Sequence, residues 1–364
     1  MAYTDIDKPS DYFNTALWTG NGSTTNITSL DFQPDFTWIK GRSDAIAHVL
    51  FDSVRGAGGN KELGSNVTYA EGGNSSISYG FLSSFNSDGF TVRNGTSSPN
   101  QADYTNKNSS TYAAWNWKAG GSASSNSNGS ITSSVSANQD AGFSIVSYTA
   151  NGNAGTTIGH GLGAVPSMII TKDRDASGLW LVYHAKSDSS APQNKYLELN
   201  TTGTVQDYPV WNDTAPTSSV FTIGTAAENN TNGRKIIAYC FAEKQGYSKF
   251  GSYVGNGNTS GTFCYTGMKP AFVLLKNTTA VDQWMIFDNK REGYNPDNDF
   301  LRPNLSNAEG TESGAKIDLL SNGFKLRGSG GGIGQTNTSG QTYIYMCFAS
   351  NPFTTSTGVP ATAR

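Results

Sequence analysis

The sequence predicts an all-β protein built from three tandem β-sandwich modules of lectin-like or jelly-roll-like design, and three observations lead to this prediction. Gly, Asn, Ser and Thr supply most of the polarity, and only 15% of the 364 residues are charged. Such a composition is typical of short strands joined by tight turns. The 7 Trp, 17 Tyr and 18 Phe provide apolar area for several cores. Finally, one series of motifs occurs three times along the chain.

The repeats define modules 1, 2 and 3 at residues 12–118, 142–245 and 246–353. Residues 1–11 form a predicted N-terminal arm, and residues 354–364 form a C-terminal tail. Residues 119–141 are rich in Ser, Gly and Asn, which favours a flexible linker. We therefore expect module 1 to be held separately and modules 2 and 3 to form a rigid pair. Each module has about 105–110 residues, the size of a β-sandwich, which we favour over a barrel.

Each module opens with an aromatic residue that is followed by an Asn-Gly pair. The motifs are WTGNG at 18–22, YTANG at 148–152 and YVGNG at 253–257. Asn-Gly between extended segments predicts a hairpin turn, because both turn residues must accept a positive φ.

Two short hydrophobic strands follow in each module. The first begins with a proline and ends with a lysine: PDFTWIK at 34–40, PSMIITK at 166–172 and PAFVLLK at 270–276. Proline at the first residue of a strand loses no ladder hydrogen bond. The second strand is HVLFD at 48–52, WLVYH at 180–184 and WMIFD at 284–288. Alternation such as Phe36/Trp38 predicts one inner face per strand, which a second sheet would bury.

The later elements keep the same order in all three modules. An asparagine with Ser or Thr two positions on occurs at Asn66, Asn200 and Asn304. Further strands start near Phe90, Phe221 and Phe324, which lie 56, 55 and 54 residues after the motif's proline. Aromatic-rich closing strands are YAAWNW at 112–117, IIAYCF at 236–241 and YIYMCF at 343–348. Spacing this constant over three copies is hard to obtain by chance.

The residues that most often carry chemistry are few. The three cysteines, Cys240, Cys264 and Cys347, provide neither a disulfide framework nor metal-ligand spacing, and we expect small core residues in a reducing cytoplasm. The three histidines, His48, His160 and His184, lack a Gly-x-Ser-x-Gly motif or a metal cluster, which favours structural or solvated roles. The glycine-rich stretch at 328–334 is interpreted as a surface loop. No enzyme activity, cofactor or metal is predicted.

One charged constellation occurs in two modules. Asp52, Arg55, Glu71 and Arg93 of module 1 correspond to Asp288, Arg291, Glu309 and Arg327 of module 3, whereas module 2 has His184, Ser187 and Gly224 in place of the Asp/Arg pair and the last arginine. We interpret the set as a buried, mutually neutralised network. The alternative is a polar pocket for a sugar or a neighbouring subunit. A paired-carboxylate glycosidase is disfavoured, because nearby arginines keep both acids ionised.

Two aromatic residues are predicted to lie in exposed loops. Trp211 belongs to YPVWND at 208–213, and Tyr294 precedes Asn295-Pro296. Aromatic rings in loops can stack on a sugar, so these two are the candidates for a surface ligand contact.

The overall charge and hydropathy exclude two classes of partner. A net charge of −3 provides no basic field for nucleic acid. No run approaches the ~18 apolar residues of a membrane span, and the first ten residues lack the apolar core of a signal peptide.

Several strings resemble structural proteins of marine tailed bacteriophages, including cyanophages, which are usually called tail-fibre-like or virion structural proteins. The strings are YTDIDKPSDYFN at 3–14, PDFTWIK at 34–40, HVLFDSVRG at 48–56, YSKFGSYVGNG at 247–257 and NGFKLR at 322–327. The resemblance covers nearly the whole chain outside 119–141. It implies a component of the virion, assembled in the host cytoplasm.

We therefore expect a particle-exposed, non-enzymatic protein that contributes to host-surface attachment, with other virion subunits and a host glycan as candidate partners. A capsid decoration, cement or knob protein is the alternative, since no coiled-coil heptads indicate a long shaft. A polysaccharide-degrading tailspike is disfavoured by the missing acid/base pair. The arm is predicted to dock on a neighbouring subunit through Tyr3, Ile6, Tyr12 and Phe13. A homo-oligomer is expected, with a trimer usual for fibres.

Overall fold

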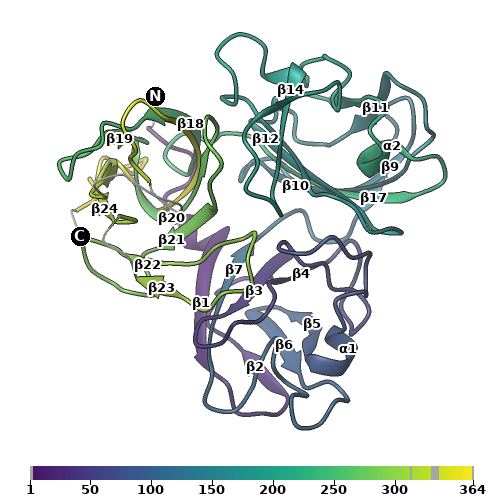
Figure 1. Ribbon diagram of the computed structural model, residues 1–364, viewed down its shortest axis with the longest axis horizontal. Coiled ribbons are helices and arrows are strands. Elements are labelled where there is room, and N and C mark those ends of the chain that lie inside the picture. Colours follow the sequence, from purple (N-terminus) through teal and green to yellow (C-terminus); the bar gives the residue numbers. More distant parts are fainter. Residues whose placement is uncertain (1–2, 312–313, 329–335, 363–364) are drawn as a thin grey trace.

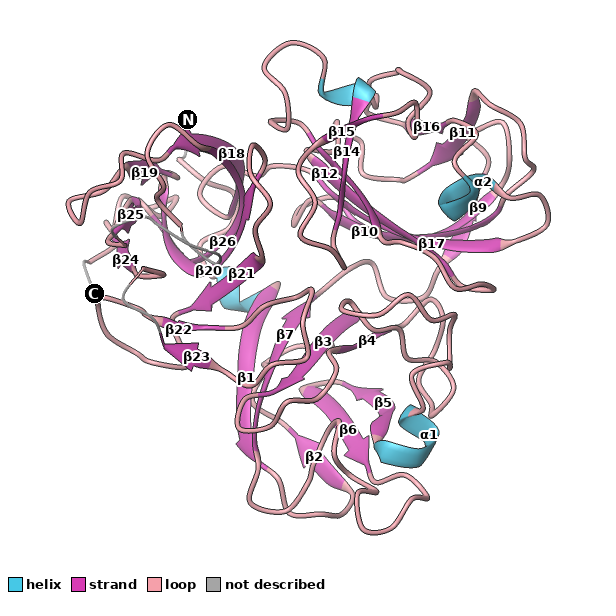
Figure 2. Cartoon of the chain, in the orientation of Figure 1, coloured by secondary structure: helices cyan, strands magenta, loops and turns pink. Residues whose placement is uncertain are grey.

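The computed structural model describes residues 3–311, 314–328 and 336–362, and the glycine-rich stretch predicted as a loop therefore lies almost entirely outside the described residues. The fold is all-β, as predicted: strands dominate, and the helical segments are single turns (Figure 2). These turns are η1 (Pro9–Asp11), α1 (Ser76–Tyr79), η2 (Pro192–Asn194) and α2 (Ala227–Asn230).

Module 1 consists of two facing antiparallel sheets. The main sheet has the order β1 (Phe13–Thr19), β7 (Thr111–Trp117), β3 (Phe36–Gly41) and β4 (Val49–Asp52). The second sheet has the order β2 (Thr25–Ile27), β6 (Gly89–Arg93) and β5 (Phe81–Asn86). Ile27, Leu82 and Phe90 of the second sheet share one buried cluster with Ile39 and Phe51 of the main sheet, which is the sandwich core.

Module 3 repeats this strand order. Its main sheet runs β18 (Ser248–Val254), β26 (Thr342–Pro352), β20 (Met268–Asn277) and β21 (Trp284–Asp288). Its second sheet runs β19 (Phe263–Tyr265), β25 (Gly323–Leu326) and β24 (Ile317–Leu320), and β22 (Asp299–Phe300) pairs with β23 (Gly310–Thr311).

Module 2 has the same central order within a larger sheet. From one edge to the other it runs β15 (Gln206–Asp207), β14 (Lys195–Glu198), β13 (Leu181–His184), β12 (Met168–Asp173), β17 (Lys235–Phe241), β10 (Phe143–Thr149), β9 (Ser133–Asn138) and β8 (Ser124–Asn126). The facing sheet pairs β11 (Thr156–Gly159) with β16 (Val220–Ile223).

The flexible-linker prediction for 119–141 is wrong, because β8 and β9 lie in this segment and extend the module 2 sheet. Val135 of β9 pairs with Val146 on one side and Ser124 on the other. Ile131 also forms a parallel bridge to Ile158 of β11. β8 lies at the edge of this sheet and is largely exposed, so it needs no large apolar residues, and β9 is held by backbone pairing with β8 and β10 on its two sides. The Ser-rich composition of this segment therefore did not indicate that it contains β8 and β9.

The expected Asn-Gly hairpins are also absent, because each turn carries the chain from the main sheet to the second sheet. β1 pairs with β7, whereas β2 pairs with β6. The turn glycines do adopt positive φ, at 75° for Gly22, 77° for Gly152 and 67° for Gly257. Each is held by an asparagine that precedes the closing strand, as in the 2.7 Å bond from the Gly22 N–H to the Asn106 carbonyl.

Figure 1 shows the three modules arranged around a common centre. One large hydrophobic cluster contains buried residues of all three modules and joins them. Trp117 of module 1 lies 5.6 Å from Phe272 and 5.7 Å from Phe348 of module 3, between ring centroids. Phe36 of module 1 stacks on Tyr239 of module 2 at 4.3 Å. The central strands of the main sheets are therefore buried on both faces, and every residue of β3 and of β12 is buried. The expectation that module 1 is held apart is wrong.

Candidate functional site

The three junctions between modules use corresponding residues in cyclic order. His48, Trp180 and Trp284 occupy the same position in their modules, and each ring nitrogen bonds a backbone carbonyl of another module. The His48 Nε2 lies 3.0 Å from the Arg302 carbonyl, the Trp180 indole donates to Gly64 at 2.9 Å, and the Trp284 indole donates to Glu198 at 2.9 Å. Module 1 thus binds module 3, module 2 binds module 1, and module 3 binds module 2.

A second cyclic contact is made by the backbone. The N–H of Glu71 donates to the Arg174 carbonyl at 2.8 Å, and the N–H of Glu309 donates to the Arg42 carbonyl at 2.8 Å. At the remaining junction the N–H of Val205 donates to the Thr278 carbonyl at 3.1 Å. Each donor lies five residues after the repeated asparagine, Asn66, Asn200 or Asn304. The arrangement is therefore pseudo-threefold within one chain.

The repeated asparagines have a structural role. The side-chain oxygens of Asn66, Asn200 and Asn304 accept the backbone N–H of His48, Trp180 and Trp284 at 2.9, 2.9 and 3.1 Å. Each asparagine therefore fixes the start of the strand that carries the junction ring.

The charged residues predicted from the sequence fill the junction between modules 3 and 1. Asp288 Oδ2 accepts the Arg291 Nε at 2.5 Å and the Trp115 indole N–H of module 1 at 3.0 Å. Glu309 accepts Arg291 at 2.7 Å and Arg42 of module 1 at 2.7 Å. Asp288 and Arg291 have fully buried side chains. Burial opposes ionisation of Asp288, but Arg291 and the Trp115 N–H hold its pKa below the usual range.

The junction between modules 1 and 2 has the same network. Asp52 Oδ2 accepts the Arg55 Nε at 2.5 Å and the Tyr239 hydroxyl of module 2 at 2.8 Å. Glu71 accepts Arg174 of module 2 at 2.5 Å and lies 3.8 Å from Arg55. The two networks are thus buried and mutually neutralised, and they also tie neighbouring modules together.

Arg93 and Arg327, which we expected in these networks, lie elsewhere. Arg93 ends β6 and is exposed, and Arg327 pairs with Asp318 at 3.2 Å with 41% of its side chain exposed. Arg93 is the last residue of β6 and Arg327 directly follows β25, so both lie at ends of second-sheet strands. Their places are taken by Arg42 and Arg174, which come from neighbouring modules.

The junction between modules 2 and 3 lacks the charged network at all four positions. His184, Ser187, Val205 and Thr278 stand where the other junctions have Asp, Arg, Glu and the second Arg. The His184 Nδ1 accepts the Lys186 N–H at 3.1 Å, so its Nε2 proton donates to the Tyr345 carbonyl at 3.1 Å. A pocket of about 620 Å³ opens here, and Ser187, Val205 and Thr278 line it.

The histidines and cysteines are packing residues in this structure. His48 and His160 are buried like His184, and each accepts a hydrogen bond at Nδ1 and contacts a backbone carbonyl through Nε2. Burial lowers the pKa of His184 to about 4 and that of His48 well below its usual value. All three cysteines are buried thiols. Among the described residues, no three His, Cys, Asp or Glu side chains form a metal-binding group.

The motif's lysines were not singled out from the sequence, yet all three are buried. The ammonium groups of Lys40, Lys172 and Lys276 each bond two backbone carbonyls, for example Gly41 at 2.6 Å and Asp44 at 3.1 Å for Lys40. Burial lowers the pKa of Lys40 to about 7 and those of Lys172 and Lys276 to about 8. The bonds close the loop after each strand, and Lys276 also reaches Thr202 of module 2.

The N-terminal arm is occupied within its own chain, which contradicts the proposed use of its anchors for a neighbouring subunit. Tyr3 donates its hydroxyl to the Gly267 carbonyl at 2.7 Å, and Ile6 is buried in the central cluster. Tyr12 packs edge-on against Tyr247 at 6.0 Å, and Phe13 stacks on Phe348 at 5.2 Å. Ile6, Tyr12 and Phe13 thus pack against the central cluster of their own chain, which leaves them unavailable to a neighbouring subunit.

The two aromatic candidates differ in position. Trp211 is 1% exposed and lies in the sandwich core of module 2, which contradicts the predicted loop contact. Its sequence neighbours are turn-forming, but Tyr183 and Phe221 pack around its ring. Tyr294 is 64% exposed.

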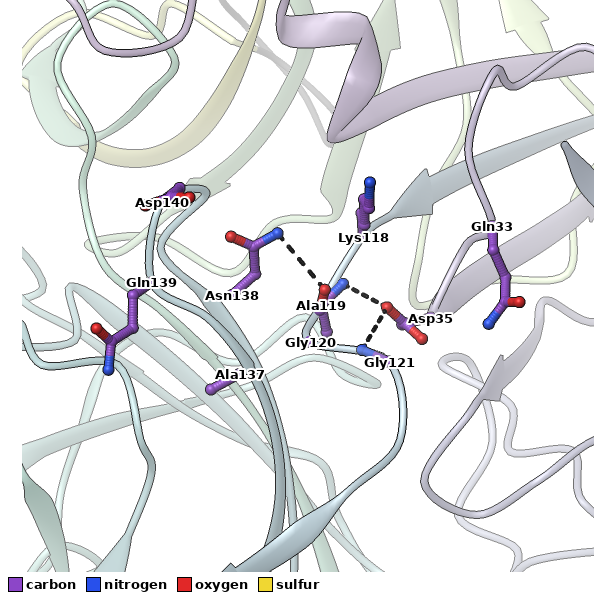
Figure 3. A pocket seen from close by; sticks show the side chains of 10 residues that line it. All are labelled: Gln33, Asp35, Lys118, Ala119, Gly120, Gly121, Ala137, Asn138, Gln139 and Asp140. Atoms are coloured by element: carbon purple, nitrogen blue, oxygen red, sulfur yellow. Dashed lines mark hydrogen bonds between the residues drawn. The ribbon is translucent and has the colours of Figure 1, made fainter. Parts of the chain in front are cut away.

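A further pocket of about 500 Å³ lies where the chain leaves module 1 (Figure 3). Asp35 Oδ2 accepts the N–H of Ala119 at 2.8 Å and of Gly121 at 3.3 Å, and Asn138 donates to the Ala119 carbonyl at 3.5 Å. Burial raises the pKa of Asp35 against these hydrogen bonds. The polar groups here hold the crossing segment in place.

Within the described residues, no helix is long and apolar enough to cross a membrane. The profile of a protein family described as a domain of unknown function (DUF7483) matches residues 8–352. A comparison with curated proteins gave no match.

Proposed function

Because the chain belongs to the DUF7483 family of unknown function over residues 8–352, we propose its role from its architecture and its resemblance to phage structural proteins. It is a non-enzymatic structural protein exposed on a bacteriophage particle, tail-fibre-like, and it contributes to attachment to the host surface. Its partners are other virion subunits.

One observation carries this proposal: three modules close cyclically on a shared aromatic core. The result is a rigid body whose Asn-, Ser- and Thr-rich loops face outward. The three histidines, a residue type often used in acid–base catalysis, are buried and bonded to backbone groups. A rigid body with outward polar loops suits adhesion in a particle.

Immunogold electron microscopy of intact particles tests the proposal. The antibody is raised against the loop around Tyr294, which is 64% exposed. Label on the tail or its tip is the expected result. If the antibody binds the free folded protein but labels no particle, the virion assignment is wrong.

Capsid decoration is the second candidate, and the pseudo-threefold arrangement favours it. A body with threefold pseudo-symmetry matches the threefold positions of a symmetric shell. Label spread over the capsid would support this role and contradict tail attachment.

A further inference from the structure

The junction between modules 2 and 3 differs from the other two in what fills it. Elsewhere an arginine and a glutamate of one module meet an arginine of the next, as Arg55, Glu71 and Arg174 do. Here the corresponding residues are Ser187, Val205 and Thr278, which are all shorter. The backbone contact is unchanged, because the Val205 N–H still reaches the Thr278 carbonyl at 3.1 Å. The modules therefore keep their spacing, and the missing side chains leave an open pocket of about 620 Å³.

We propose that this pocket, called the junction pocket, binds a neutral sugar residue. The proposal deepens the proposed function, since it supplies a ligand class for host attachment. A volume of about 620 Å³ lies in the range of small-molecule sites. The walls come from two modules: residues 185–189, Pro192 and Val205 of module 2, and Ser252, Thr278, Thr279 and Thr342 of module 3.

The lining is rich in hydroxyl groups. Ser187 Oγ is buried and has no hydrogen-bond partner among the described residues, so a ligand hydroxyl can satisfy it. Thr278 donates its hydroxyl to the Thr342 carbonyl at 3.1 Å, which leaves its oxygen free to accept. Ser189, Ser252 and Thr279 are exposed at the rim.

The charge in the pocket is balanced, which favours a neutral ligand over an anion. Lys186 and Asp188 both line the wall. Asp188 Oδ1 accepts the N–H of Ser190 and Ala191 at 2.8 and 2.9 Å, and these bonds lower its pKa to about 2. The group is therefore ionised and its Oδ2 is an acceptor for a sugar hydroxyl. Pro192 and Val205 add apolar surface for the carbon face of a sugar ring.

A sugar residue cannot bind at the corresponding positions of the other two junctions. There the arginine and glutamate side chains fill the space and satisfy each other's hydrogen bonds, as in the 2.7 Å pairs of Glu309 with Arg291 and Arg42. The same arginine and glutamate side chains, placed at the corresponding positions, would therefore fill the junction pocket.

The test is saturation-transfer difference NMR of the full chain with a panel of neutral and anionic monosaccharides. We expect signals from at least one neutral sugar. The double variant Val205→Glu/Thr278→Arg rebuilds the Glu71–Arg174 pair at the open junction and should abolish these signals. The milder Ser187→Ala removes one hydroxyl and should weaken binding about two- to tenfold.

The control variant is Gln139→Arg, which introduces an arginine at the Asp35 pocket and should leave the signals unchanged. Circular dichroism shows whether each variant is folded. If no neutral sugar gives a signal, or if the folded double variant binds as well as the wild type, the inference is wrong. Particle labelling is independent of this result, so a labelled particle without sugar binding overturns only the ligand, and sugar binding without labelling overturns only the virion role.

Discussion

Asp288 shows what a single buried charge does at a junction. Its carboxylate bonds Arg291 of its own module and Trp115 of module 1, and both members of the ion pair have fully buried side chains. The substitution Asp288→Ala leaves the Arg291 charge buried without this partner. We expect a loss of about 3–5 kcal/mol in the free energy of unfolding, measured by urea denaturation. The control Asp207→Ala breaks an ion pair in which Asp207 is 70% exposed and should change little. Equal losses in both variants would contradict a junction role.

His184 makes the stability depend on pH. Burial lowers its pKa to about 4 in the folded protein, against about 6.5 in an unfolded chain. The unfolded state therefore binds the proton first, and stability is lost as the pH falls from about 6.5 to about 4. Replacement by Gln removes the titration while keeping a donor for the Tyr345 carbonyl. Between these pH values, we expect the free energy of unfolding of His184→Gln to fall by about 3 kcal/mol less than that of the wild type, measured by urea denaturation. If the free energy of unfolding of the two proteins depends on pH in the same way, His184 is not the group responsible.

The sequence predicted the charged residues that recur in modules 1 and 3 and form the networks, except Arg93 and Arg327, but it did not predict their partners in other modules. The Asp52–Arg55 and Asp288–Arg291 pairs are three residues apart and were found by comparing modules. Arg42 and Arg174 were missed because their carboxylate partners belong to other modules. Trp211 was predicted in an exposed loop because its sequence neighbours are turn residues, but its ring is buried in the core of module 2.

The segment 119–141 shows that strand pairing can override a linker-like composition. β9 is hydrogen-bonded on both sides, so proteases should find few accessible bonds in it. We expect limited proteolysis with mass spectrometry to leave this segment intact. Val135→Pro removes a ladder donor from this middle strand and should make the segment cleavable. Rapid cleavage of the wild type at 119–141 would show that the segment is not held.

At the level of strands, the repeats predicted most elements of the sheets. The proline-to-lysine strands correspond to β3, β12 and β20, and the closing strands to β7, β17 and β26. The expectation of one buried face is wrong, because runs such as AFVLL at 271–275 are apolar on both sides. Such continuous runs are typical of strands buried on both faces, and here the second face packs on the other modules.

The whole molecule should unfold as one unit. Phe348 is 1% exposed and contacts rings of modules 1, 2 and 3, including Phe13 and Phe241. We expect a single transition in calorimetry, and Phe348→Ala should lower its midpoint with a loss of about 3–5 kcal/mol. The control Phe263→Ala truncates a ring that is 44% exposed and should cost much less. Three separate transitions would mean that the modules fold independently.

The cyclic junctions also bear on how such a molecule can diverge. In a homotrimer of one module, every substitution appears at all three interfaces at once, so a change that opens one interface opens all of them. Covalent fusion removes this constraint. The Asp/Arg/Glu cluster can stay at two junctions and hold the ring closed, while the third accumulates short side chains without dismantling the assembly. Tandem duplication thereby separates the interfaces that carry stability from one that is free to acquire a ligand.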